Sequence, residues 1–286
     1  MNKLTFQISN LKFDIRFMDL LDQVPLFIFL HGFKSFRNWG FIPYICENLA
    51  YNGIITLNLD FSSNGVISEN PILYDTDTFA NNTISKEVQD VDLLLSILLN
   101  DSKENRALGQ SLKNWNGQIY LCGHSRGAGI AIIAADKYRE IQKVVLLSAI
   151  SDFNRYTPRL INKWIEGGFL EFNDPQSNQK LRMNSTYILD LIENQEKYNL
   201  KKIMQRLDKP TILITAENDL TTPIRESNEL IENYKKNQNN KKNHCNFVLI
   251  KKANHLFNCT HPFNGTNAYL DEVLQNVKEF LLYEKI

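Results

Sequence analysis

The chain has 286 residues, of which 43% are hydrophobic, so it is long enough to bury a full core as one large domain or two small ones. Its 32 basic residues balance 32 acidic residues, and no long run of one sign occurs. This balance excludes the charge signature of proteins that bind nucleic acid or anionic membranes, and the expected ligand is a small, neutral or weakly charged molecule.

The sequence also carries signals about the cellular compartment. The first 17 residues alternate polar and apolar types without the apolar core of a signal peptide, and no run is long enough to span a membrane. The four cysteines show neither C-x-x-C pairing nor zinc-ligand spacing; they are Cys46, Cys122, Cys245 and Cys259. We therefore expect free thiols, no metal site, no membrane partner and a location in the reducing cytoplasm.

In chain order, the first predicted elements are two strands, 4–9 and 13–17, whose alternating pattern and short turn predict an antiparallel hairpin. Continuous apolar runs then predict buried strands, and helical spacing predicts amphipathic helices. These elements are strand 25–33, helix 41–53, strand 54–61, helix 85–100 with Ser85 as its N-cap, strand 118–125, helix 126–138, strands 143–149 and 211–218, helix 224–237, strand 246–255 and helix 267–285. Two polar stretches, 102–117 and 235–244, predict solvated loops.

The alternation of strands and helices predicts an α/β fold with a mostly parallel central sheet and helices on both faces. The leading hairpin adds antiparallel strands at one edge. Residues 150–210 are too long for an ordinary loop and carry short amphipathic pieces, so they predict an inserted helical cap. The expected organisation is a core made of residues 1–149 and 211–286, with the cap insertion at 150–210.

The stretch GHSRGAG places Ser125 between Gly123 and Gly127, where a predicted strand gives way to a predicted helix. A serine hydroxyl becomes a useful nucleophile when a base takes its proton and when it projects clear of the sheet. A tight strand-to-helix turn achieves that projection, and it requires minimal side chains two positions either side of the serine. The pattern therefore favours a catalytic nucleophile over a simple packing turn.

The partners of such a serine follow later strands in the chain. The stretch AENDLTTP overlaps the end of the predicted strand 211–218 and offers Glu217 and Asp219. The stretch ANHLF, at the end of the predicted strand 246–255, offers His255. Both stretches lie at the carboxyl ends of predicted strands, where the active sites of open parallel sheets gather. His255 would act as general base toward Ser125 and then as general acid toward the leaving group.

In order and spacing, HGF, GHSRGAG, AENDLTTP and ANHLF resemble the motifs of the α/β-hydrolase superfamily, and the resemblance covers nearly the whole chain. It implies the α/β-hydrolase fold and a catalytic triad of Ser125, Asp219 and His255. Asp219 fits the family pattern because it stands four positions before Pro223, whereas Glu217 is the alternative acid.

An oxyanion hole needs two hydrogen-bond donors directed at the developing negative charge. The backbone N–H of Arg126, directly after the nucleophile, is the first expected donor. The family resemblance implies that the N–H of Phe33 is the second and that His31 shapes this turn as a buried, hydrogen-bonded histidine. His124 is expected to be a packing residue, and His261 is a minor candidate for lining the site.

HGFKSFRNWGF and DFSSNG together resemble bacterial serine hydrolases near the dienelactone-hydrolase and cinnamoyl-esterase groups. Dienelactone hydrolases themselves use a cysteine, and Cys122 lies three positions before Ser125, so serine chemistry is expected. The chain departs from the usual D-x-x-G-x-G-x-S stretch, because Ser63 and Ile67 replace a Gly and a Ser. This departure weakens the transfer of a substrate from a familiar subgroup.

The expected activity is hydrolysis of small or medium carboxylic esters through an acyl-enzyme, with a small-molecule ester or amide as substrate and no metal or organic cofactor. A serine peptidase or amidase with the same triad is one alternative. A binding module that kept the fold and lost turnover is the other. The oligomeric state stays open, with a homodimer among the alternatives.

Overall fold

The computed structural model of the chain describes residues 1–19, 22–236 and 245–282. The second polar stretch, 235–244, lies almost wholly outside these residues. Within them, the main sheet contains β1 (Asn2–Ile8), β2 (Leu11–Phe17), β3 (Val24–Leu30), β4 (Ile55–Asp60), β7 (Trp115–His124), β8 (Ile141–Leu147), β11 (Thr211–Ala216) and β12 (Cys245–Ile250).

The strands follow the spatial order β1-β2-β4-β3-β7-β8-β11-β12. β2 pairs antiparallel with β1 and with β4, whereas each neighbouring pair from β4 to β12 is parallel. The α/β fold class, the mostly parallel sheet and the hairpin at its edge are therefore confirmed.

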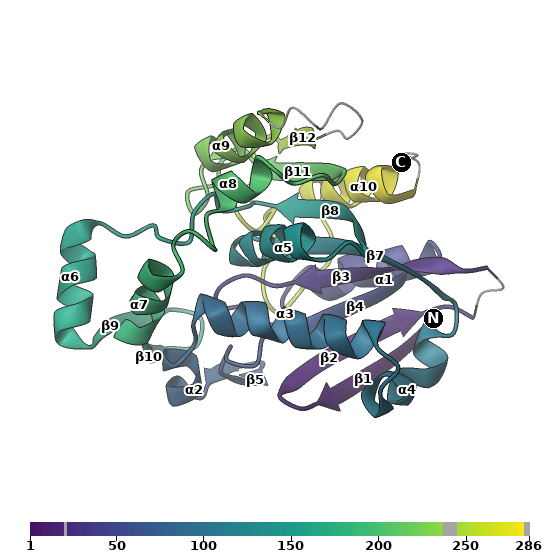
Figure 1. Ribbon diagram of the computed structural model, residues 1–286, viewed down its shortest axis with the longest axis horizontal. Coiled ribbons are helices and arrows are strands. Elements are labelled where there is room, and N and C mark those ends of the chain that lie inside the picture. The colour runs from purple at the N-terminus through teal and green to yellow at the C-terminus, as the bar shows by residue number, and fades with distance from the viewer. Residues whose placement is uncertain (20–21, 237–244, 283–286) are drawn as a thin grey trace.

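Helices cover both faces of the sheet, which explains the continuous apolar runs of its central strands. α3 (Ile84–Leu99) and α5 (Arg126–Lys137) lie on the near face in Figure 1, and α1 (Ile42–Tyr51) and α10 (Ala268–Leu282) lie behind the sheet. α9 (Ile224–Lys235) packs on β11 and β12. Leu26 to Leu30 in β3 are fully buried, because a strand with helices on both sides has no solvated face.

Two sequence predictions are wrong: the N-cap of the helix predicted at 85–100, and the loop predicted at 102–117. α3 begins at Ile84, and its N-cap is Thr83, whose hydroxyl accepts from the Lys86 N–H; Ser85 instead bonds Asp190 and Tyr198. The stretch 102–117 is not a loop. It contains α4 (Lys103–Leu108), a short 3₁₀ helix (Gly109–Leu112) and the start of β7, and the Ser102 hydroxyl caps α4.

Residues 150–210 leave the sheet after β8 and return at β11. They contain α6 (Pro158–Gly167), β9 (Phe169–Asp174), β10 (Gln179–Asn184), α7 (Ser185–Glu193) and α8 (Leu200–Met204), and α6, α7 and the β9–β10 hairpin form a lobe at one side of Figure 1. The hairpin was not predicted, although Leu170, Phe172, Leu181 and Met183 alternate with polar residues and a turn separates the two pairs. α8 packs on α5 and α9, so the insertion rejoins the core before β11.

A second hairpin, β5 (Val66–Glu69) and β6 (Ile72–Tyr74), and the short helix α2 (Thr76–Ala80) lie between β4 and α3. The side-chain amide of Gln179 in β10 bonds both the N–H and the carbonyl of Tyr74, at 2.7 and 3.0 Å. The insertion is therefore attached to the core by contacts with backbone groups as well as by apolar packing. None of the helices in the described part of the chain is both long and apolar enough to cross a membrane.

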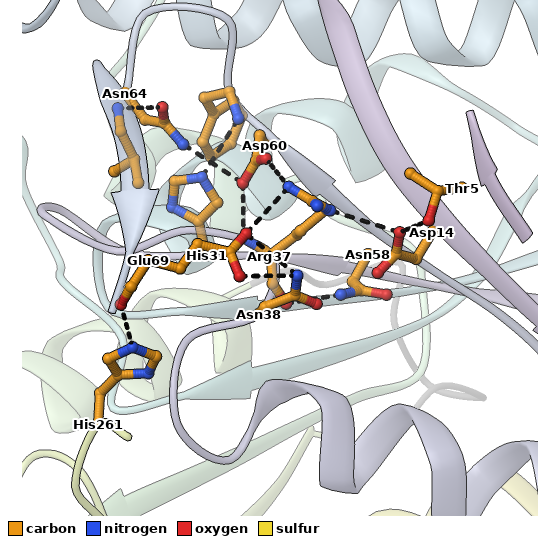
Figure 2. A network of polar contacts seen from close by, with 12 residues as sticks. Thr5, Asp14, His31, Arg37, Asn38, Asn58, Asp60, Asn64, Glu69 and His261 are labelled. Atoms are coloured by element: carbon orange, nitrogen blue, oxygen red, sulfur yellow. Dashed lines mark hydrogen bonds and ion pairs between the residues drawn. The ribbon is translucent and has the colours of Figure 1, made fainter. Parts of the chain in front are cut away.

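A buried network of charged groups joins the β1–β2 hairpin to the loop after β3 (Figure 2). Arg37 pairs with Asp60, lies 3.4 Å from Asp14 and also reaches Glu69. Burial alone would lower the pKa of the Arg37 guanidinium, but Asp60 and Asp14 raise it. The pKa of Asp14 is lowered despite burial, because Thr5 and Lys3 donate to it and Arg37 lies close by.

Replacing Arg37 by Met should lower the free energy of unfolding by about 3–5 kcal/mol, because it removes the guanidinium that pairs with the largely buried Asp60. Urea unfolding measured by circular dichroism checks this value. Arg106→Met is the matched control: Arg106 pairs with Asp101 on the surface, and its loss should leave stability nearly unchanged. Equal stability of the two variants would contradict the role given to the network.

Candidate functional site

Ser125 lies on a sharp turn between β7 and α5, with φ of 55° and ψ of −118°. This is a conformation that non-glycine residues rarely adopt, and it costs about 1–3 kcal/mol. The surrounding backbone enforces it. A Cβ at position 123 would lie 2.3 Å from the Gly127 carbonyl oxygen, and a Cβ at position 127 would lie 2.4 Å from the Leu30 carbonyl oxygen. Both flanking glycines are therefore required by close backbone contacts.

The structure places Asp219, and not Glu217, against His255. Asp219 follows β11, His255 follows β12, and the His255 Nδ1 lies 2.7 Å from the Asp219 Oδ2. Glu217 is exposed, and its carboxylate accepts from the backbone N–H of Lys252.

The Asp219 carboxylate is fully buried but well supplied with donors. Its Oδ1 accepts from the N–H groups of Thr221 and Thr222, at 2.9 and 2.7 Å. Burial works to raise its pKa, but the hydrogen bonds from His255 and Thr222 outweigh burial and lower it. Asp219 is thus an ionised acceptor at neutral pH and can orient an imidazole.

Ser125 and His255 line the same cavity, which has a volume of about 270 Å³. Phe33, Trp39 and Leu256 give it apolar walls. Its remaining lining residues are Gly32, Lys34, Ser35, His124, Gln176 and Thr221. Gln176 belongs to the turn of the β9–β10 hairpin, so the inserted segment contributes to the cavity.

The two residues expected to supply oxyanion donors lie beside each other. Phe33 lines the cavity, and the Arg126 guanidinium lies 4.5 Å from the centre of the Phe33 ring. The same guanidinium pairs with buried Glu87 at 2.5 Å, so it is directed into the protein. Arg126 is the first residue of α5, and the N–H groups in the first turn of a helix have no acceptor within the helix. Of the N–H groups in this turn, that of Ala128 bonds the Ser125 carbonyl oxygen, and Arg126 is not among the residues that line the cavity.

His31 is buried and hydrogen-bonded, as expected. Its Nδ1 lies 2.8 Å from the Gly32 carbonyl oxygen and its Nε2 accepts from the Phe61 N–H, so the neutral ring satisfies both partners. Burial lowers its pKa to about 3.

His124 has a function that the sequence did not reveal. Its Nε2 lies 3.0 Å from the backbone oxygen of His255, so the residue before Ser125 is bonded to the loop that carries the imidazole. Burial, and then the proximity of His255, lower the pKa of His124 to about 3. The neutral ring therefore donates through Nε2. Sequence alone could not show this bond, because the two residues are 131 positions apart.

Two basic residues of the loop after β3, and His261, lie at the margin of the cavity or outside it. Lys34 lines the cavity and pairs with buried Asp174 of β9 at 2.7 Å. Arg37 is buried in the charged network and does not line the cavity. His261 accepts from the Gly40 N–H and bonds the Glu69 oxygen, so it ties two loops together and is not a lining residue (Figure 2). Among residues 1–19, 22–236 and 245–282, no group of three or more His, Cys, Asp or Glu side chains could hold a metal ion.

The order and direction of the strands in the main sheet are those of the α/β-hydrolase fold. Residues 107–267, more than half of the chain, match the family described as BAAT / acyl-CoA thioester hydrolase C terminal, and the chain belongs to this family. It is therefore a hydrolase of the esterase or thioester hydrolase type. A search of curated protein sequences gives no significant match.

Solved structures share the fold over almost the whole chain. Est1E from Butyrivibrio proteoclasticus has a TM-score of 0.63 at 18% identity, covering 99% of this chain and 98% of its own. Alpha/beta hydrolase domain-containing protein 10 from mouse has a TM-score of 0.64 at 16% identity, with 98% of each chain covered. The thermophilic esterase Est2 from Thermogutta terrifontis has a TM-score of 0.61 at 16% identity, covering 95% of this chain and 87% of its own.

The buried neutral histidines predict a loss of stability in mild acid. Their pKa of about 3 in the folded protein lies below the value near 6.5 expected after unfolding, so the unfolded chain binds more protons as the pH falls below 6.5. Between pH 7 and pH 5, each of these two histidines should lower the free energy of unfolding by about 2 kcal/mol.

Urea unfolding at several pH values checks this with His124→Gln, which keeps an N–H donor but does not titrate. The variant should lose about 2 kcal/mol less than the wild type over that pH range. Parallel stability curves for the two proteins would contradict a neutral, buried His124.

Proposed function

We propose that the chain is a serine hydrolase that cleaves small carboxylic esters through an acyl-enzyme on Ser125. The observation that supports this proposal most directly is the 2.7 Å contact between His255 Nδ1 and buried Asp219. His255 also lines the same cavity as Ser125. An imidazole that donates through Nδ1 to an ionised carboxylate has its Nε2 lone pair free to accept the proton of a serine hydroxyl.

The reaction follows from these positions. As Ser125 Oγ attacks the ester carbonyl, its proton passes to His255 Nε2, and Asp219 stabilises the resulting imidazolium. The oxyanion of the tetrahedral intermediate would accept from the backbone N–H groups of Phe33 and Arg126, each worth about 3 kcal/mol in related sites. His255 then protonates the leaving alkoxide. Water, activated in the same way, cleaves the acyl-enzyme.

The cavity argues for a small acyl group. Its volume of about 270 Å³ lies just below the ~300–1,000 Å³ typical of sites for drug-sized ligands. Phe33 and Trp39 offer aromatic contacts, which suit a short alkyl or aryl acyl group. A thioester is cleaved by the same steps with a thiolate as leaving group, and the family description makes thioesters part of the same substrate class.

The amidase alternative is disfavoured by charge. An aminopeptidase-like enzyme requires a carboxylate to bind the free amine of its substrate. The residues that line the cavity in the described chain include no Asp or Glu. The acidic side chains Glu166, Glu171, Asp174 and Asp190 of the insertion are not among the lining residues. The contact between His255 and Asp219, and the cavity that His255 shares with Ser125, favour turnover over a binding module.

Ser125→Ala should abolish labelling by a fluorophosphonate probe, because the probe reacts with an activated serine. Ser125→Ala and His255→Ala should each lower kcat/KM for p-nitrophenyl acetate by at least ~10⁴-fold, and Asp219→Asn by ~10³–10⁴-fold, since the three groups act as a unit. In-gel fluorescence measures the labelling, and the release of p-nitrophenol followed by absorbance gives kcat/KM.

Two matched controls accompany these variants. Ser96→Ala removes an exposed serine of α3, and Glu217→Gln neutralises the exposed carboxylate beside the acid loop. Both should label and turn over within about twofold of the wild type, as surface substitutions usually do. Persistent labelling of Ser125→Ala, or a large loss in Glu217→Gln with full activity in Asp219→Asn, would refute the assignment.

A substrate panel distinguishes the reaction classes. We expect turnover of p-nitrophenyl acetate and butyrate, of phenyl esters and of short acyl-CoA thioesters, with p-nitrophenyl laurate slower because its chain exceeds the cavity. Aminoacyl p-nitroanilides should not react, because no carboxylate lines the cavity to hold their amine. Efficient cleavage of the anilides by purified protein, lost in Ser125→Ala, would replace the esterase proposal by the amidase one.

A further inference from the structure

Thr222 lies at the meeting point of the acid, the imidazole and the sheet. It is buried, three residues after Asp219, in the loop that leads into α9. Its hydroxyl oxygen lies 2.7 Å from the Asp219 Oδ2, 3.0 Å from the Ser148 carbonyl oxygen and 3.2 Å from the His255 Nδ1. Ser148 directly follows β8, so one hydroxyl contacts segments that follow three different strands.

The donors and acceptors around this hydroxyl determine which nitrogen of His255 carries the proton. The ionised Asp219 carboxylate and the Ser148 carbonyl can only accept, and the Thr222 hydroxyl offers one proton and two lone pairs. If Nδ1 lacked a proton, three acceptors would compete for the single proton of Thr222. With Nδ1 protonated, Nδ1–H and Thr222 O–H supply two protons for two obligate acceptors, and a Thr222 lone pair faces Nδ1–H.

The same arrangement serves both protonation states of His255. In the neutral imidazole, Nδ1–H donates to the Asp219 Oδ2, the Thr222 proton can bond the Ser148 carbonyl, and a Thr222 lone pair faces Nδ1–H. When His255 becomes an imidazolium, the same bonds remain and Nδ1–H holds the Asp219 Oδ2 more strongly, as charge-assisted hydrogen bonds do.

We propose that Thr222 is a positioning residue: its hydroxyl holds the His255 ring with Nδ1 protonated and Nε2 free for the Ser125 proton. This rests on the proposed function, because it assigns Thr222 a task in that mechanism. Thr222 touches neither the substrate nor the transferred proton, and it acts through Asp219 and His255. The hydroxyl is required, whereas the methyl group is not.

Thr222→Val replaces the hydroxyl by a methyl group of similar size and tests the proposal. We expect kcat for p-nitrophenyl acetate to fall about tenfold with KM changed less than twofold, which is the loss of roughly one net hydrogen bond in the transition state. The rate of fluorophosphonate labelling should fall by the same factor. The downfield proton resonance of His255 Nδ1–H should move or broaden. Thr222→Ser keeps the hydroxyl and should restore kcat to within about threefold of the wild type.

Thr215→Val is the matched control. Thr215 is an equally buried threonine of β11 whose hydroxyl bonds Ser227 at 2.5 Å. This variant should lose stability without loss of kcat or change in the downfield resonance. If Thr222→Val keeps full kcat and the wild-type resonance, the positioning proposal fails while the triad stands. If Ser125→Ala and Asp219→Asn remain active, the proposed function itself fails.

Discussion

The strained backbone of Ser125 is the constraint on which the rest of the site depends. α5 begins directly at the end of β7, and the backbone of its first turn leaves no room for a Cβ at position 123. The same turn lies so close to the carbonyl oxygens of Leu30 and His31 that position 127 has no room for one either. The positive φ at Ser125 is the conformation that these close contacts leave. The same contacts bring the start of α5 beside the β3 loop. Phe33 in this loop and Arg126 at the start of α5 carry the two backbone N–H groups proposed to bind the oxyanion.

The imidazole and the acid reach this turn because three parallel strands end at one edge of the sheet. β7 leads to Ser125, β11 to Asp219 and β12 to His255. The contacts that complete the arrangement are local and polar. His124 bonds the backbone of His255, Thr222 bonds Asp219 and Ser148, and the Ser125 N–H bonds the Leu147 oxygen. The bonds of His124 to His255, of Thr222 to Ser148 and of Ser125 to Leu147 join segments that are distant in sequence. The site is therefore held by polar bonds between segments as well as by the strands beneath them.

Much of this could be predicted from local pattern. The strand and helix periodicities identified most elements, the G-x-S-x-G spacing identified the turn, and the order of serine, acid and histidine identified the partners. The errors have physical reasons. Thr83 rather than Ser85 caps α3, because the helix begins at Ile84 and Ser85 lies within its first turn, where it bonds Asp190 of α7. The β9–β10 hairpin was overlooked because its strands are short and half exposed, and the polar run at 102–117 hid a capped helix.

The sequence by itself determined the α/β class, the position of the proposed nucleophile and the two carboxylates between which a choice remained. These depend on periodicity, glycine spacing and chain order, which are properties of neighbouring residues. Only the tertiary structure decided that Asp219 contacts His255 while Glu217 turns to Lys252, that Arg37 is buried in a charge network, and that His124 and Thr222 bond the loops that carry His255 and Asp219. Those outcomes depend on distances between segments far apart in the chain, and a linear pattern carries no information about such distances.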